Sequence, residues 1–595
     1  MREYSVPQSF TIPEDASMAD TVFRYAAECP NLVPFKKLDG GRWVDVTAAQ
    51  FAAEVAATAK GLMASGVELG DRVAILSATR YEWVVLDYAI WTAGGCTVAI
   101  YETSSADQAQ WILEDSATSL LVVENSAHAE RVKDVAEAAP ALREVLQIDT
   151  GALAELATRG AGIDDDALHE RRRQVHASSP ATLIYTSGTT GRPKGVQLTH
   201  SNFYAESAAV QIALGDAMEE GKRTLMFLPL AHVFARAISF GAFDAKVTVA
   251  HTADLTTLLD QFAVFKPNFI LSVPRVFEKV YNSAKQKAED GGKGKIFSAA
   301  ADTAIAWSEA QDTGGAGLGL RLKHALFDKL VYAKLRAALG GECTRAVSGG
   351  AALGARLGHF FRGVGVPVYE GYGLTETSAA ITVNTTGNQK VGTVGKPING
   401  HAAKIAEDGE LLVRGPVVFD GYWKNEQATA DAIRDGWFHT GDLGSIDTEG
   451  YVSITGRKKE IIVTAGGKNV APATLEDALR AHPLISQCLV VGDAKPFIGA
   501  LITLDPEALP GWLERNSLPA DTPIADLVTH PDLVSEIDAA VSEGNKKVSQ
   551  PEQIKKYRIL DVDFTVETGE LTPTLKLKRN IIHTQHAEAI ERIYT

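Results

Sequence analysis

The chain has 595 residues, 45% of them hydrophobic, and a formal net charge of −16. This length is enough to bury one or more cores, and the composition excludes a disordered chain. The acidic balance argues against general nucleic-acid binding, because the phosphate backbone favours basic proteins. We therefore expect a folded protein whose partners include no nucleic acid.

Targeting and membrane-spanning segments are not indicated. The N-terminus lacks the apolar region of a signal peptide. The longest apolar candidate, residues 83–100, is broken by Asp87 and two glycines, so it falls short of the ~18 apolar residues of a span. The four cysteines lie far apart and form no metal or disulfide pattern. These features predict a cytoplasmic protein.

In chain order, short apolar runs first alternate with helix-like segments. The predicted buried strands are Arg72–Leu76, Cys96–Ile100, Ser119–Val123, Ala181–Tyr185, Lys246–Ala250 and Asn268–Ser272. Such alternation predicts parallel sheets built from βαβ units, and the nearly continuous apolar strands indicate helices on both faces. We expect the α/β class, with doubly wound subdomains.

Near Gly400 the pattern changes. Short strands with Gly and Asp turns predict antiparallel structure, interpreted as a small β barrel, at Glu410–Arg414, residues 436–442 and residues 450–454. After Gly456 a mixed α+β segment begins, with a helix expected to open at Thr474 and Asp477 as a capping signal. The predicted domains are therefore 1–457 and a smaller one at 458–595.

One loop has the composition of a phosphate site. Tyr185-Thr-Ser-Gly-Thr-Thr-Gly-Arg-Pro-Lys-Gly195 directly follows a predicted strand. Glycines let backbone N–H groups converge on phosphate oxygens, hydroxyls add donors, and Lys194 adds a positive charge. No Walker A pattern occurs. A surface turn is the alternative, but the position after a buried strand favours phosphate binding.

This loop is similar to the signature loop of the ANL superfamily, which comprises acyl-CoA synthetases, peptide-synthetase adenylation domains and luciferases. Four further segments resemble the superfamily's adenine and magnesium motif, ribose motif, hinge and lysine-bearing tail, in the same order: Tyr369–Thr377, Trp437–Leu443, Gly456–Ile462 and Leu571–Arg579. Within the superfamily the chain most resembles long-chain fatty-acyl-CoA synthetases, on Leu228–Phe234, Ser348–Leu353, Val463–Pro472 and the tail.

The resemblance implies a reaction and its co-substrates. The enzyme would join a fatty acid to CoA through an acyl-adenylate, using ATP and Mg²⁺ and releasing AMP and pyrophosphate. Domain 1–457 would bind AMP and the acyl group, and domain 458–595 would be a mobile lid. Lys576 would contact the carboxylate and the α-phosphate, Thr375 would contact the α-phosphate, and Glu376 would bind the Mg²⁺ together with Thr186. Two anions must meet in this reaction, so cations placed in advance are required.

The resemblance also implies the binding residues. The ATP and AMP set is Thr186, Ser187, Gly188, Thr189, Thr190, Gly191, Lys194, Gly350, Ala351, Tyr372, Gly373, Asp442 and Arg457. Tyr372 would stack on adenine and Asp442 would accept the ribose hydroxyls. The acyl and CoA set is His232, Phe234, Gly466, Gly467 and Lys468, and the hinge residue is Lys459.

Each residue also has an ordinary structural interpretation. Glu376, Asp442 and Lys576 could be solvated surface charges and Tyr372 a core aromatic, but the ordered motifs favour the functional interpretation. For His232 a core histidine and a residue near the acyl pocket are equally well supported. Phe234, Ile238, Phe240 and Phe243 could line an acyl tunnel, but each is more typical of a helix core. Lys578 and Arg579 are expected to form an exposed basic edge.

Two questions stay open at this point. The acceptor of the acyl group could be CoA or a carrier-protein phosphopantetheine, whereas a scaffold with a degenerate site is disfavoured because the motifs are intact. The basic run Arg321–Arg336 could touch membrane lipid or the CoA phosphates. The favoured interpretation is a surface helix that packs its apolar face on the core. The sequence assigns no chain length and no oligomeric state.

Overall fold

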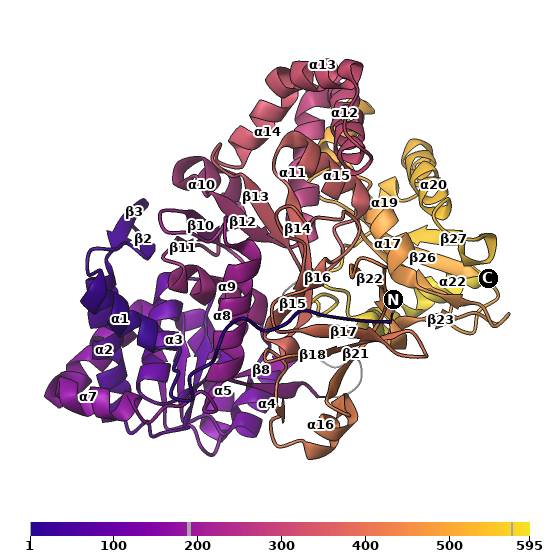
Figure 1. Cartoon of the computed structure of the whole chain (residues 1–595). Helices are drawn as coiled ribbons and strands as arrows, with labels where there is room; N and C mark the ends of the chain where they lie inside the picture. The colour runs from indigo at the N-terminus through magenta and orange to yellow at the C-terminus, as the bar shows by residue number, and fades with distance from the viewer. Residues whose placement is uncertain (1, 187–191, 573–574) are drawn as a thin grey trace.

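The computed structural model describes residues 2–186, 192–572 and 575–595. Within these residues the strands form four sheets up to residue 457 and two smaller sheets after it. Figure 1 shows the C-terminal elements, in yellow and light orange, gathered at one side of the larger N-terminal part. The expected α/β class, with a large N-terminal and a smaller C-terminal part, is confirmed.

A seven-stranded sheet forms the centre of the N-terminal part. Its order is β19 (Gly421–Tyr422), β9 (Lys194–Thr199), β8 (Pro180–Thr186), β5 (Cys96–Ile100), β4 (Arg72–Leu76), β6 (Leu120–Val123) and β7 (Glu144–Gln147). Val73 and Ile75 of β4 join the core that contains α2 (Ala48–Ala64) and α3 (Tyr81–Thr92). Ala74 and Leu76 join the core with α4 (Ala106–Ser116) and α5 (Ser126–Ala138). Helices therefore cover both faces, as the apolar strands predicted.

Two mixed sheets flank this centre. One has the order β10 (Arg223–Met226), β11 (Thr248–His251), β2 (Phe35–Asp39) and β3 (Arg42–Val46). The other has the order β12 (Phe269–Ser272), β13 (Arg345–Ser348), β14 (Val368–Leu374), β15 (Ala379–Val383) and β16 (Lys396–Pro397). β14 runs parallel to β13 and antiparallel to β15, so the motif at its carboxyl end turns directly back on itself.

A buried ion pair fixes helix α9 (Val233–Asp244) to the central sheet. The Arg236 Nε donates to Asp87 Oδ2 over 2.7 Å, and Nη1 donates to the Thr182 hydroxyl over 2.6 Å. Both charged side chains are almost fully buried. A buried guanidinium needs such a partner, because an unpaired buried charge is strongly destabilising. The pair therefore sets the position of α9, whose first turn reaches the site.

The antiparallel segment is confirmed, although its form differs from the expected barrel. Its order is β1 (Glu3–Ser5), β17 (Ala402–Ile405), β18 (Glu410–Arg414), β21 (Trp437–Ile446) and β20 (Ile433–Arg434), with β22 (Val452–Arg457) also on β21. This path runs openly from β1 to β20. The short turns predicted the strand direction, but closure depends on contacts far apart in the chain.

The C-terminal part has its own cores. β25 (Ile485–Val491), β26 (Ile498–Leu504) and β27 (Ile554–Ile559) form its sheet, with α17 (Pro472–Arg480), α18 (Leu509–Arg515), α20 (Pro531–Asn545) and α22 (Ala587–Tyr594) packed around it. Helix α17 begins at Pro472 rather than at Thr474, because proline suits the first helical position. Asp477 bonds Arg480 instead of capping the helix.

Two ion pairs join the parts, one half-buried and one exposed. Arg275 of α11 (Pro274–Asp290) lies 2.8 Å from Asp505, and the exposed Lys279 lies 2.7 Å from Glu507. An exposed pair such as Lys279–Glu507 contributes little, about 0–1 kcal/mol. No helix of the described residues is long and apolar enough to cross a membrane.

Candidate active site

Three predicted residues meet at the buried carboxylate of Asp442. The Tyr372 hydroxyl donates to Asp442 Oδ2 over 2.6 Å, and Arg457 Nε donates to Oδ1 over 2.9 Å. Asp442 and Arg457 face each other across the β21–β22 register, while Tyr372 comes from β14. Burial and the Asp442 charge raise the pKa of Tyr372, so its hydroxyl remains a donor. The adenine, ribose and hinge motifs therefore each contribute one residue to the same hydrogen-bonded cluster.

Lys576 projects from a tight hairpin toward the same point. Leu571 pairs with Leu577, and the Thr572 N–H donates to the Lys576 carbonyl over 2.8 Å. Burial and then the charge of Arg457 lower the pKa of Lys576, although the residue keeps access to solvent. A carboxylate or phosphate beside Lys576 would favour the charged form of the lysine.

Glu376 is held by a residue outside the predicted set. The Tyr422 hydroxyl donates to Glu376 Oε1 over 2.8 Å, and Lys194 Nζ lies 5.0 Å from the centre of the Tyr422 ring. Tyr422 reaches this place because β19 pairs with β9, the strand that Lys194 begins. Tyr422 thus links the phosphate loop to the magnesium motif.

The Glu376 carboxylate fits a Mg²⁺ ligand. It is half-buried, and in the described residues it forms no ion pair with a cationic side chain. Mg²⁺ is commonly bound by one or two carboxylates together with phosphate oxygens, so a larger cluster of protein ligands is not required. Thr186 pairs with Lys194 at the end of β8. The predicted residues Ser187, Gly188, Thr189, Thr190 and Gly191 lie outside the described residues.

Close backbone approach explains two glycines of the motifs. A Cβ on Gly373 would lie 1.4 Å from the Ala379 carbonyl oxygen, and one on Gly349 would lie 2.8 Å from the Phe234 ring. Gly350, with φ 83°, and Ala351 follow as an exposed loop beside β14. Thr375 is buried at the start of the turn after β14. Any side chain at Gly373 would displace this turn.

His232 stands at the start of a helix as its N-cap residue. It precedes α9, and its Nδ1 accepts from the Phe234 N–H over 3.1 Å, so it caps the helix. Burial, and after it the charge of Lys576, lowers the pKa of His232 to about 3. Phe234 is half-buried, whereas Phe240 and Phe243 are core residues, as expected.

The predicted hinge residue lies between two anchors. Lys459 is exposed, while Lys458 bonds Asp408 over 2.6 Å and Glu460 lies 3.3 Å from Arg579. The expected exposed edge at Arg579 is wrong, because its guanidinium also bonds both oxygens of a buried carboxylate, that of Glu476. This clasp fixes the base of the lysine hairpin within the C-terminal part.

The predicted CoA residues occupy a separate hairpin tip. β23 (Ile462–Val463) and β24 (Asn469–Val470) pair, and Gly466, Gly467 and Lys468 lie exposed between them. Lys468 lies 3.3 Å from Glu552 of the same part. The structure therefore does not bring this tip into the cluster around Asp442.

Two residues at the site were not identified from the sequence. Tyr422 stands in a Gly-Tyr-Trp-Lys run that has no recognisable motif spacing. Glu206 of α8 (His200–Leu214) is fully buried and accepts from the Ala380 N–H over 2.8 Å, which supports the turn after Glu376. Burial raises the pKa of Glu206 well above its usual range. For Glu206, the only signal in the sequence is a polar residue on an apolar helix face.

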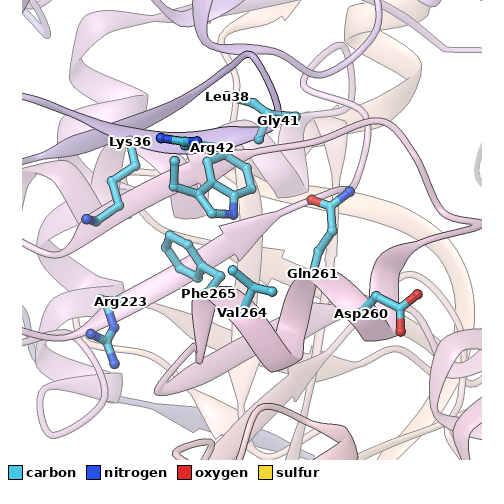
Figure 2. Close-up of a pocket in the computed structure, with 10 residues that line it drawn as sticks. Lys36, Leu38, Gly41, Arg42, Arg223, Asp260, Gln261, Val264 and Phe265 are labelled. Carbon is cyan, nitrogen blue, oxygen red and sulfur yellow. The ribbon is translucent and has the colours of Figure 1, made fainter.

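A separate cavity of about 550 Å³ lies between the β2–β3 hairpin and α10 (Leu258–Phe265). Figure 2 shows Phe265 and Val264 with Arg42, Lys36 and Arg223 around it. None of the predicted site residues lines this cavity.

We predict that Tyr422→Phe raises the Mg²⁺ concentration needed for half-maximal adenylation and lowers kcat/KM about fivefold. The variant loses one hydrogen bond to a charged group, about 1.5 kcal/mol or less, and keeps the ring beside Lys194. ATP–pyrophosphate exchange at varied Mg²⁺ measures both quantities. Tyr4→Phe, far from Glu376 in the sequence and on another sheet, is the control; an unchanged Mg²⁺ requirement in Tyr422→Phe would contradict the role.

Comparisons with known proteins agree with this geometry. The chain matches the AMP-binding enzyme family over residues 22–423 and the AMP-binding enzyme C-terminal domain over residues 459–595. It is 58% identical over 597 residues to the long-chain-fatty-acid–CoA ligase FadD15 of Mycobacterium bovis, with 100% of both chains covered.

Two solved structures share the fold. The A domain of a carboxylic acid reductase from Segniliparus rugosus has a TM-score of 0.74 at 20% identity, covering 97% of this chain and 94% of that chain. The O-succinylbenzoate coenzyme A synthetase of Bacillus subtilis, solved with ATP and magnesium, has a TM-score of 0.67 at 22% identity, covering 94% and 98%. On the family match and the full-length relative, this chain belongs to the AMP-binding enzymes.

Proposed function

We propose that the protein is an AMP-forming long-chain fatty-acid–CoA ligase. The observation that carries the proposal is the hydrogen-bonded Tyr372–Asp442–Arg457 cluster, with Lys576 near enough for the charges of Arg457 and Asp442 to act on its pKa. This arrangement puts a lysine beside groups suited to a nucleotide. The fatty-acid and CoA specificity is supported by the relative named above, which is similar along its whole length.

In the first half-reaction a fatty-acid carboxylate oxygen attacks the α-phosphorus of ATP and pyrophosphate leaves. Lys576 would stand between the two anions, and placing this cation in advance lowers the barrier. Thr375 would contact the α-phosphate, and Asp442 would receive the ribose hydroxyls. Mg²⁺ at Glu376, shared with Thr186, would neutralise phosphate charge. The products are pyrophosphate and the acyl-adenylate.

In the second half-reaction the CoA thiol attacks the acyl carbonyl and AMP leaves. A lysine at the carbonyl would obstruct the thiol, so the C-terminal part must move between the steps. We assign domains 1–457 and 458–595 and place the hinge at Lys459. The assignment is supported by the anchors on both sides of that residue and by the limits of the two family matches. The motion would bring Gly466, Gly467 and Lys468 to the pantetheine arm.

We also propose that the enzyme works in the cytoplasm in peripheral contact with membrane lipid. The use of ATP and CoA and the four free cysteines support the compartment. A long-chain fatty acid partitions into bilayers, which supports contact of the enzyme with lipid.

The function is tested by ATP–pyrophosphate exchange across acids from acetate to stearate, followed by thioester formation with CoA. We expect acids of about C12–C18 to exceed acetate by more than a thousandfold, because each buried CH₂ contributes ~0.8 kcal/mol. Activity that is equal on acetate, or restricted to aromatic acids, would reject the substrate class. If ATP–pyrophosphate exchange occurs but no thioester forms with free CoA, a carrier-protein acceptor would be favoured instead.

We predict that Lys576→Ala lowers the rate of adenylation by at least a hundredfold, since removing a cation that faces two reacting anions costs about 3 kcal/mol or more. Supplied acyl-adenylate should still be converted to acyl-CoA. Lys578→Ala, two residues away and half-buried, is the matched control and should adenylate normally. If Lys578→Ala loses adenylation while Lys576→Ala keeps it, Lys578 is the lysine that faces the two reacting anions.

We predict that Lys459→Pro separates the half-reactions. Proline fixes φ near −65°, and a hinge works by changing backbone dihedrals at a few residues, so the variant should keep one arrangement. Adenylation should stay near normal, while acyl-CoA formation from supplied adenylate falls at least tenfold. Lys459→Ala removes the charge, leaves the backbone free and should behave as the wild type. Parallel loss of both steps in the proline variant would refute the hinge.

A further inference from the structure

Helix α13 (Leu318–Phe327) and the π-helical turn after it (Asp328–Tyr332) present four leucines to solvent. The exposed fractions are 74% for Leu318, 66% for Leu322, 56% for Leu326 and 49% for Leu330. We call these four side chains the leucine face. Large apolar side chains gathered on one face mark an interaction surface, whereas isolated ones do not.

The opposite side of this helix is what packs on the protein. The His324 ring stacks on Trp307 of α12 (Gly294–Asp312) at 4.3 Å, and its Nε2 lies 2.7 Å from the Gly363 carbonyl oxygen. Phe327 and Tyr332 are buried. The expected packing of an apolar face on the core is thus confirmed for Phe327 and Tyr332, whereas the four leucines lie outside that contact. Aromatic residues hold the helix, and the leucines remain available.

Basic residues alternate with the leucine face. Arg321, Lys323, Lys329 and Lys334 are exposed, and among the described residues none of the three lysines forms an ion pair. The nearest acid along the helix, Asp328, is bonded to Arg336 over 2.7 Å. In a chain of net charge −16, this is a local positive surface around apolar side chains. Its charge complements an anionic partner.

The geometry distinguishes lipid from a second copy of the chain. Leucines four residues apart advance by about 40° per step on an α-helix, so they spread over a broad stripe instead of the narrow seam of a coiled coil. A second copy would also place lysines opposite lysines. An anionic bilayer accepts a broad apolar stripe and attracts the lysines.

We propose that the leucine face and its lysines form an interfacial helix that docks the enzyme on anionic lipid bilayers. The leucines enter the boundary between headgroups and acyl chains, and the lysines contact the headgroup phosphates. The docking itself is independent of catalysis. Only its purpose, access to fatty acids dissolved in the bilayer, rests on the proposed function.

The test is co-sedimentation of the full chain with vesicles, without ATP. Wild-type protein should bind vesicles of phosphatidylcholine with phosphatidylglycerol at least tenfold more strongly than vesicles of phosphatidylcholine alone. Leu322→Ser/Leu326→Ser should lose at least tenfold of this binding, and Lys323→Glu/Lys329→Glu should lose the preference for phosphatidylglycerol. All these side chains are exposed, so the thermal unfolding midpoint should not change.

Matched controls and a solution measurement complete the design. Leu38→Ser/Val264→Ser, which changes exposed apolar residues at the cavity of Figure 2, should bind vesicles as the wild type does. Lys576→Ala should also bind normally, even though it is expected to be inactive, so failure of the proposed function would not hide docking. Sedimentation velocity reports the oligomeric state of each variant.

Three results would overturn the proposal. The first is a wild-type protein that binds neither kind of vesicle. The second is that Leu38→Ser/Val264→Ser loses vesicle binding while Leu322→Ser/Leu326→Ser keeps it. The lipid contact would then lie at the cavity of Figure 2. The third concerns the leucine variant. If the wild-type protein forms a larger assembly, and the variant is monomeric but binds vesicles unchanged, the leucine face contacts a second copy of the chain and not lipid.

Discussion

The buried carboxylate of Asp442 is the interaction on which the site depends. A buried acid must be satisfied by donors, and here the donors are Tyr372 from β14 and Arg457 from the end of β22. One side chain thereby fixes the distance between two sheets and the direction in which the chain enters the C-terminal part. Lys576 arrives at the same place by way of its own hairpin.

The proposed hinge residue, Lys459, lies between two residues that form ion pairs. Lys458 is tied to Asp408 of the N-terminal part, and Glu460 lies beside Arg579, which Glu476 also holds. Of the ion pairs between α11 and the C-terminal part, Lys279–Glu507 is exposed and therefore weak, whereas Arg275–Asp505 is half-buried. The geometry favours rotation of a rigid unit over distortion of the lysine hairpin.

Local pattern predicted what local physics determines. The strands β4 and β5 were predicted to the residue, because a buried parallel strand is an uninterrupted apolar run between turns. The contacts of Tyr422 and Glu206 were not predictable, since each joins segments far apart in the chain. The exposure of the leucine face was not predicted either, for a related reason. Periodicity identifies an amphipathic helix, but only tertiary contacts decide which face is covered.

Membrane docking through α13 is compatible with the two-step reaction because of where the helix is anchored. Figure 1 shows α13 at the outer edge of the N-terminal part, resting on α12, which in turn packs on α15 (Ala355–Val364). The C-terminal part instead meets α11, through Arg275 and Lys279. A bilayer held by the leucine face would therefore restrain the part that binds nucleotide and leave rotation about Lys459 free. An enzyme built this way can stay on lipid through both half-reactions.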